Sequence, residues 1–248
     1  MLKHKIVFVS KDDQFKVDRA VTDKLTAETP ELQFCYVARN ARPLADVYNE
    51  FLDEKGRDWD FVYFVHADVE LDFKGLAEHV ESVKDKYEVM GLCGCEKFNV
   101  SQRPLNWFCG SRPFPGNRWG CVSHGELGGQ TSFFSAHSPD VTDREVACVD
   151  GLCVIISRKA ADAGMRFDPS VGDFDCYDTD ISMQTVLKYG FRLGVVVRKD
   201  LRHYSVGKSI LTQEFLKDDA KLRAKWGFPI PPPPPALAQS QPPPQQQT

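Results

Sequence analysis

The 248-residue sequence lacks the short motifs that mark several common protein classes. It contains eight cysteines but no C-x-x-C pair, so we do not expect a structural zinc site. The first apolar run, residues 5–9, is followed by neither a G-x-G-x-x-G motif nor the glycines of a P-loop. This argues against a dinucleotide-binding Rossmann domain and against a P-loop enzyme. No apolar run is long enough to span a bilayer, and the amino terminus does not resemble a signal peptide.

The charge and the cysteines set expectations for partners and compartment. A net charge of −4 gives no indication of a nucleic-acid or acidic-membrane partner. Several cysteines lie in apolar runs, where a thiol behaves as a small hydrophobic group: Cys35, Cys93, Cys148 and Cys153. Without a secretion signal, we expect reduced thiols and a cytoplasmic location.

The first 93 residues alternate between two hydrophobic periods. Short apolar runs at 5–9, 32–37, 61–65 and 89–93 predict strands, and stripes at helical spacing lie between them. Such alternation predicts an α/β domain with a mostly parallel central sheet flanked by helices. Right-handed crossovers would place the strand ends at one edge of that sheet.

Two later segments depart from this rhythm. Residues 94–143 are rich in Gly, Pro, Ser and aromatics without a sustained period, which suits a functional lid over a site. Within it, Trp107 or Trp119 either stacks on a sugar or packs under the loop. From Pro229 the chain becomes rich in Pro and Gln. We therefore predict one domain over 1–228 and a disordered or polyproline II tail over 229–248, suited to binding a partner or linking to another domain.

Polar side chains follow the most apolar predicted strand, Phe61 to Val65. His66 and Asp68 come directly after it, and ligands of open α/β sheets bind beyond the carboxyl ends of strands. The two side chains could face one divalent cation, or they could simply end a strand and begin a turn.

Acidic residues also gather before a predicted helix. Four carboxylates occur within residues 173–180, and Asp150-Gly151 interrupts another predicted strand. One of them, Asp178 or Asp180, could cap the helix, but a cap needs a single carboxylate. Crowded carboxylates are tolerated most easily beside a cation or a basic ligand.

These motifs occur in an order that resembles a known family. Y-N at 48–49, V-Y-F-V-H-A-D-V at 62–69 and W-G at 119–120 precede V-D-G-L-C-V-I-I-S-R at 149–158. F-D-P, Y-D-T-D-I-S, G-F-R-L-G-V-V-V and R-H-Y-S-V-G come next. Over residues 6–226 the chain resembles family 2 glycosyltransferases of GT-A fold. It looks most similar to the streptomycin-biosynthesis-type branch, whose members carry H-x-D in place of D-x-D.

The resemblance implies roles for individual residues. Asp68 matches the acid that binds Mn²⁺ or Mg²⁺ at the donor diphosphate, and His203 matches a histidine that completes this site. His66 would ligate the metal, contact the donor or only pack. Asp178 matches the general base, with Asp180 as the alternative. The remaining assignments are donor binding by Ser10, Arg39 and Asn49 and acceptor binding by Asp150 and Trp119.

The sequence supports two hypotheses about function. The first is an inverting, metal-dependent transfer of a sugar, of the hexosyl or deoxyhexosyl class, from a nucleotide-sugar donor to a glycan or other hydroxyl acceptor. The second is a catalytically inactive GT-A-fold module that binds carbohydrate or protein. A sugar nucleotidyltransferase is disfavoured, because the Gly-rich, basic phosphate loop of such enzymes is missing after the first strand.

Overall fold

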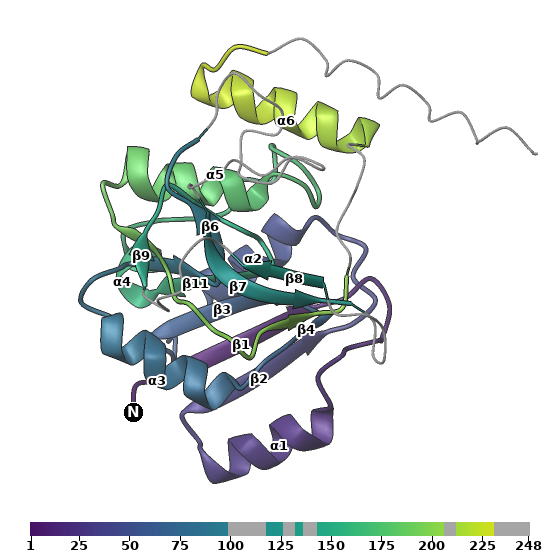
Figure 1. Cartoon of the computed structure of the whole chain (residues 1–248), viewed down its shortest axis with the longest axis vertical. Helices are drawn as coiled ribbons and strands as arrows, with labels where there is room; N and C mark the ends of the chain where they lie inside the picture. The colour runs from purple at the N-terminus through teal and green to yellow at the C-terminus, as the bar shows by residue number, and fades with distance from the viewer. Residues whose placement is uncertain (99–117, 126–131, 136–142, 206–211, 231–248) are drawn as a thin grey trace, which may run out of the picture.

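A computed structural model describes residues 1–98, 118–125, 132–135, 143–205 and 212–230 (Figure 1). Its main sheet has seven strands in the order β2-β1-β3-β11-β5-β12-β9. In that order the strands are Leu32–Val37, His4–Val9, Phe61–His66, Cys153–Ser157, Val89–Gly91, Leu193–Val195 and Arg144–Glu145. The apolar runs predicted as strands all lie in this sheet, except that the fourth run splits after Gly91.

Most strands of the main sheet run in one direction. β1 pairs in parallel with β2 and with β3, and β5 pairs in parallel with β12. β11 lies antiparallel between β3 and β5, so these two neighbours share a direction, and β9 closes the edge antiparallel to β12. The prediction of a mostly parallel central sheet is therefore confirmed.

Helices cover both faces of the sheet, which explains why the central strands β3 and β11 are apolar along almost their whole length. On β1, Ile6 and Phe8 belong to a core that includes Phe73, Leu76 and Val80 of α3 (Phe73–Val83). Their neighbours Val7 and Val9 belong to a second core that includes the buried side of α2 (Leu44–Asp53). α1 (Arg19–Glu28) packs at β2, and α4 (Arg158–Asp162) follows β11.

A smaller second sheet lies against the carboxyl ends of the main strands. Its order is β10-β6-β7-β13-β4, with β8 (Ser132–Ser135) also paired to β7. The other strands are Cys148–Val149, Cys93–Cys95, Arg118–His124, Arg202–His203 and Val69–Glu70, in that order. Most of the predicted lid, residues 94–143, lies outside the described residues; the described part supplies β6, β7 and β8.

The helices after β11 complete the domain. α5 (Tyr177–Met183) continues into the π-helical turn η1 (Gln184–Lys188), and α6 (Gln213–Trp226) lies beside α5 at the top of Figure 1. The expectation that Asp178 or Asp180 caps α5 is wrong: the cap position is Cys176, in left-handed conformation, and both aspartates lie in the first turn. Of the predicted tail, residues 229–248, the first two positions are described and residues 231–248 lie outside the described residues. Among the helices that the structure describes, none has the length and hydropathy needed to cross a bilayer.

Candidate active site at the strand ends

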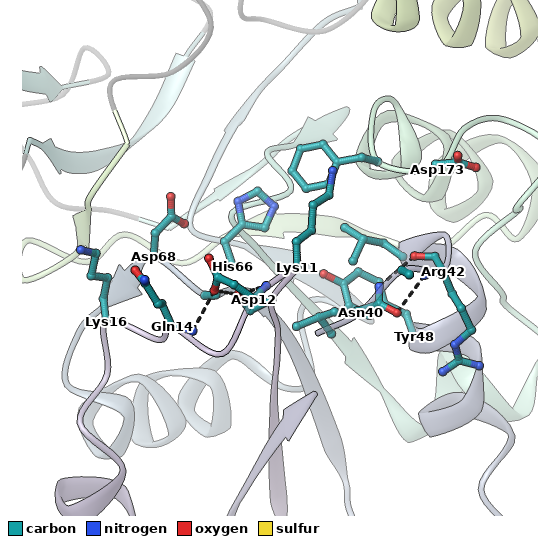
Figure 2. A pocket seen from close by; sticks show the side chains of 16 residues that line it. Lys11, Asp12, Gln14, Lys16, Asn40, Arg42, Tyr48, His66, Asp68 and Asp173 are labelled. Carbon is teal, nitrogen blue, oxygen red and sulfur yellow. Dashed lines mark hydrogen bonds between the residues drawn. The ribbon is translucent and has the colours of Figure 1, made fainter. Parts of the chain in front are cut away.

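The carboxyl ends of β1 and β3 open into a cavity of about 660 Å³, a size typical of small-molecule sites. The two strands are in parallel register with Val9 opposite His66, so the polar residues that follow each strand meet at one place. The polar lining comes from four segments (Figure 2). They contribute Ser10, Lys11, Asp12, Gln14 and Lys16 after β1; Asn40 and Arg42 after β2; His66 and Asp68 at the end of β3 and just beyond it; and Asp173 before α5.

Three side chains able to bind a metal lie together here: His66 and Asp68 line the cavity, and His203 lies beside Asp68. His66 ends β3, and Asp68 precedes β4. β4 pairs antiparallel with β13, which places His203 opposite Val69, next to Asp68. The Nε2 atom of His203 lies 3.3 Å from Oδ1 of Asp68. The ligand atoms of His66, Asp68 and His203 all lie within 4.8 Å of one another, although His203 is far from the other two in the sequence.

The hydrogen bonds of His66 fix which ring nitrogen is available. Its Nε2 lies 2.9 Å from the Tyr177 hydroxyl, and that hydroxyl donates to the carbonyl of Gly151 at 2.8 Å. The hydroxyl has one proton, so both contacts are satisfied together only when His66 donates from Nε2. A neutral His66 then carries its lone pair on Nδ1, the state that a metal ligand needs.

The three side chains fit a divalent transition metal. At metal–ligand distances of about 2.1 Å, ligands on opposite sides of a cation are about 4.2 Å apart, close to the observed spread. Two imidazoles and one carboxylate suit Mn²⁺ or Zn²⁺ better than Mg²⁺, which prefers oxygen ligands. Burial and the neighbouring His203 lower the pKa of His66. Burial opposes ionisation of Asp68, yet the contact with His203 holds its pKa below the usual value. His203 Nδ1 is buried without a hydrogen-bond partner among the described residues.

Asp178 lies on the Tyr177 side of the cluster. Its Oδ2 accepts a hydrogen bond from the Gly151 amide at 3.0 Å, and its Oδ1 accepts one from the Thr179 amide at 2.7 Å. Desolvation, reinforced by the charge of Asp150, raises its pKa to about 7. The path His66–Tyr177–Gly151–Asp178 therefore joins the cluster to a carboxylate that changes charge near neutral pH.

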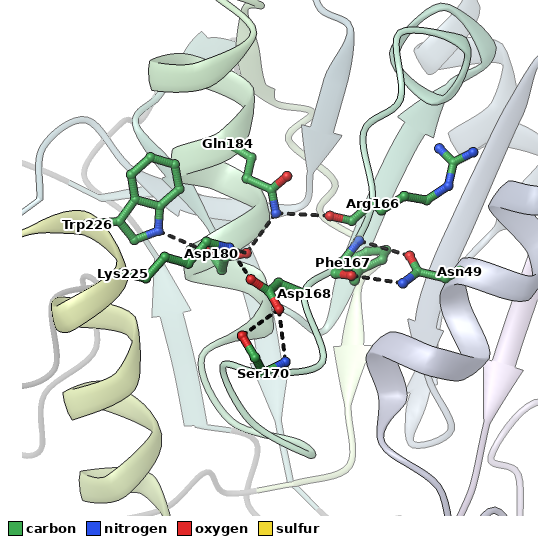
Figure 3. A network of polar contacts seen from close by, with 9 residues as sticks. All are labelled: Asn49, Arg166, Phe167, Asp168, Ser170, Asp180, Gln184, Lys225 and Trp226. Atoms are coloured by element: carbon green, nitrogen blue, oxygen red, sulfur yellow. Dashed lines mark hydrogen bonds and ion pairs between the residues drawn. The ribbon is translucent and has the colours of Figure 1, made fainter.

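Two side chains predicted to bind the donor form hydrogen bonds or ion pairs outside the cavity. The amide of Asn49 donates to the Phe167 carbonyl at 2.8 Å and accepts from the Phe167 amide at 2.9 Å (Figure 3). Arg39 is exposed and pairs with Asp13, and neither Asn49 nor Arg39 lines the cavity. Ser10 does line it, but its hydroxyl donates to Asp12 at 2.7 Å. We therefore leave Arg39 and Asn49 out of the proposed site.

Asp180 is held in a structural network, shown in Figure 3. Its side chain is 1 % exposed, and its oxygens accept hydrogen bonds from Gln184, Lys225 and Trp226 at 2.7 to 2.8 Å. Lys225 also pairs with Asp168. Because both oxygens are engaged in anchoring α6 to α5, Asp178 is the better candidate for the base.

The predicted acceptor residues differ in their surroundings. Trp119 donates from Nε1 to Glu96 at 2.9 Å, and the guanidinium of Arg144 lies 4.7 Å from the centre of its ring. One face of the indole is therefore covered. Asp150 precedes Gly151 and accepts from the Leu152 amide at 2.9 Å, beside Asp178.

A further imidazole lies near the cluster without having been indicated by the sequence. His124 at the end of β7 lies opposite His203 in register, with the ring centres 5.3 Å apart. Its Nδ1 donates to the Ser205 carbonyl at 2.9 Å, and burial lowers its pKa. Its segment has no hydrophobic period that would place the residue at a strand end, so no local signal marks it.

Comparisons with known proteins identify the fold. The sequence matches no family model, and no curated protein matches it. Among solved structures, GalNAc-T7 with UDP, GalNAc and Mn²⁺ aligns with a TM-score of 0.50 at 10% identity, over 90% of this chain and 48% of that one. The chain thus spans about half the length of that protein. A197 from STIV aligns at 0.43 with 15% identity over 86% and 91% of the two chains. S. aureus TarS 1-349 in complex with UDP aligns at 0.44 with 11% identity over 90% and 65%.

At such identities the likeness concerns the fold and not the chemistry. The central sheet covered by helices on both faces, together with the alignment to GalNAc-T7, establishes the architecture. The streptomycin-biosynthesis-type branch stays a prediction. The chain has a GT-A-like fold.

Proposed function

We propose that this protein is a metal-dependent glycosyltransferase that moves a sugar from a nucleotide-sugar donor to a hydroxyl acceptor with inversion. The observation that carries the proposal is the cluster of His66, Asp68 and His203, two of which line a ligand-sized cavity. The GT-A-like fold supports it, as does the presence of UDP and Mn²⁺ in the GalNAc-T7 structure.

The cluster provides the site for a cation such as Mn²⁺. A bound cation supplies Lewis-acid chemistry that neutralises the charge of a leaving diphosphate. The chain's own part is to hold the ligands ready. Tyr177 keeps His66 in the tautomer with a free Nδ1, and the β4–β13 pair keeps His203 beside Asp68.

Asp178 is the proposed general base. Attack of an acceptor hydroxyl requires loss of its proton as the new bond forms, and a carboxylate within hydrogen-bond reach accepts it. A pKa of about 7 makes Asp178 a stronger base than an ordinary aspartate while leaving much of it ionised at neutral pH. The amides of Gly151 and Thr179 fix the orientation of its carboxylate.

The proposal is tested by measuring sugar transfer from UDP-, GDP- and dTDP-sugars with Mn²⁺ and a panel of hydroxyl acceptors. Asp68→Asn should abolish metal-dependent donor binding, whereas Asp178→Asn should spare binding and remove transfer. Asp58→Asn serves as the matched control, because Asp58 is an exposed partner of Lys3 at the opposite edge of the sheet. Absence of turnover with every donor, in a protein that still binds carbohydrate or protein, would favour the inactive module.

A further inference from the structure

Two lysines of the cavity form no ion pair with any acidic side chain that the structure describes. Lys11 and Lys16 both line the cavity, and neither forms an ion pair within the described part of the chain. The third cationic lining residue, Arg42, is held by two hydrogen bonds to Glu50. Lys11 and Lys16 are therefore the basic groups available to an anionic ligand.

Aromatic rings hold both ammonium groups without neutralising them. Lys11 Nζ lies 5.4 Å from the centre of the Phe174 ring, and Phe174 in turn stacks on His66 at 5.8 Å. Lys16 Nζ lies 5.4 Å from the centre of the Tyr204 ring. A ring face attracts a cation but leaves its formal charge intact, so each lysine can still meet an anion.

Figure 2 shows Lys16 on one side of Asp68 and His66 and Lys11 on the other. Lys11 reaches His66 through Phe174. The amide of Lys16 donates to the Ala67 carbonyl at 2.8 Å, and the amide of Tyr204 donates to the Asp68 carbonyl at 2.9 Å. Lys16 therefore stands beside Asp68.

The loop that bears the lysines is also held in place. The Asp12 carboxylate accepts from the Ser10 hydroxyl and from the Gln14 amide, each at 2.7 Å. The Asp12 carbonyl accepts from the Arg39 amide at 2.6 Å. This order reduces the conformational entropy lost when a ligand binds.

The charges in the cavity explain why the lysines would act together with a cation. Among the described residues, the lining contains three acidic side chains, Asp12, Asp68 and Asp173, and three basic ones, so these residues give no net charge to attract an anion. A divalent cation at His66, Asp68 and His203 would leave the cavity positive. The cation would bind the middle of an anion, and the lysines would contact the oxygens at its two ends.

We propose that Lys11 and Lys16 form, with the cation, a three-point site for the two phosphates of a nucleoside diphosphate, one lysine on each side. This inference rests on the proposed function and adds to it the two residues, Lys11 and Lys16, that would hold the phosphates of its donor. The nucleoside then points away from Asp68 toward Asn40 and Asp173 at the other end of the cavity (Figure 2).

The test uses inorganic pyrophosphate and orthophosphate as probes, titrated calorimetrically into the full chain at saturating Mn²⁺. Pyrophosphate should bind at least about tenfold more tightly than orthophosphate, and Lys11→Gln and Lys16→Gln should each weaken pyrophosphate about tenfold. Lys16→Arg should retain most of the affinity, because it keeps the charge. Lys24→Gln is the control, since Lys24 is an exposed lysine that faces Glu28 on α1. Mn²⁺ titration of each variant checks that the metal cluster is intact.

The results separate this inference from the proposed function. Pyrophosphate affinities that fall only in the Lys11 and Lys16 variants, with Mn²⁺ binding unchanged, support the diphosphate site even if no sugar is transferred. The inference is overturned if the lysine variants bind pyrophosphate like the wild type, or if both anions bind alike, even in a protein that transfers sugar.

Discussion

The protonation of Asp178 should make sugar transfer depend on pH near neutrality. If this carboxylate is the base, transfer requires its ionised form, and its pKa of about 7 makes the ionised fraction change across neutral pH. About a tenth is ionised at pH 6 and about nine tenths at pH 8, so kcat should rise about tenfold over this range. An ordinary aspartate would be ionised throughout and give a flat profile.

The assay is initial-rate sugar transfer from pH 5.5 to 8.5 at saturating Mn²⁺ and donor, so that metal and donor binding do not contribute to the slope. Asp178→Asn should lower kcat by about 10² to 10⁴-fold and abolish the rise with pH. A wild-type profile that is flat between pH 6 and 8, or a variant that keeps more than a tenth of kcat, would refute the assignment of Asp178 as base.

Three further predictions concern the structure around the site. Lys225→Met leaves the buried Asp180 carboxylate without its ion-pair partner, so the free energy of unfolding measured in urea should fall by about 3 kcal/mol. Lys24→Met removes an exposed ion pair and should change that free energy by less than about 1 kcal/mol. Equal effects would contradict the anchoring role of Lys225. Gly151→Ala places a Cβ 2.4 Å from the Tyr177 hydroxyl, which accepts the Nε2 proton of His66, so Mn²⁺ affinity measured by calorimetry should fall because His66 loses the acceptor that fixes its tautomer; unchanged affinity would contradict the tautomer argument. Burial lowers the pKa of His4 in the folded state, so as pH falls below about 6.5 the unfolded chain binds a proton before the folded protein does, and stability declines. His4→Gln should therefore flatten the dependence of Tm on pH between 6.5 and 5. An unchanged slope would contradict this role of His4.

The main sheet was predictable because its signals are local. The runs at 32–37 and 61–65 match β2 and β3 closely, and β3 reads as a continuous apolar stretch because it is buried on both faces. Where each strand ends is also local, and parallel pairing of β1 with β3 then brings Ser10 and His66 to one edge. The prediction that His66, Asp68 and His203 lie together at this edge of the sheet depends on the position of the strand ends together with the family resemblance.

The roles of other side chains depended on contacts that no local pattern shows. Asp178 and Asp180 lie two residues apart on α5, yet one faces Gly151 and the other is taken by Lys225 and Trp226 from α6. The amide of Asn49 is occupied by the backbone of Phe167, 118 residues away. Spacing assigns such residues to a face of a helix, and only the packing of distant elements decides what that face meets.

The central claim is that His66, Asp68 and His203 bind one divalent cation. Mn²⁺ electron paramagnetic resonance with nitrogen spin-echo modulation tests it most directly, because it detects imidazole nitrogens bound to the metal. We expect one tightly bound Mn²⁺ with two coordinated nitrogens in the wild type, a single nitrogen in His203→Gln, and loss of tight binding in Asp68→Asn. Bound Mn²⁺ without nitrogen coupling, or binding that survives in Asp68→Asn at wild-type affinity, would contradict the account.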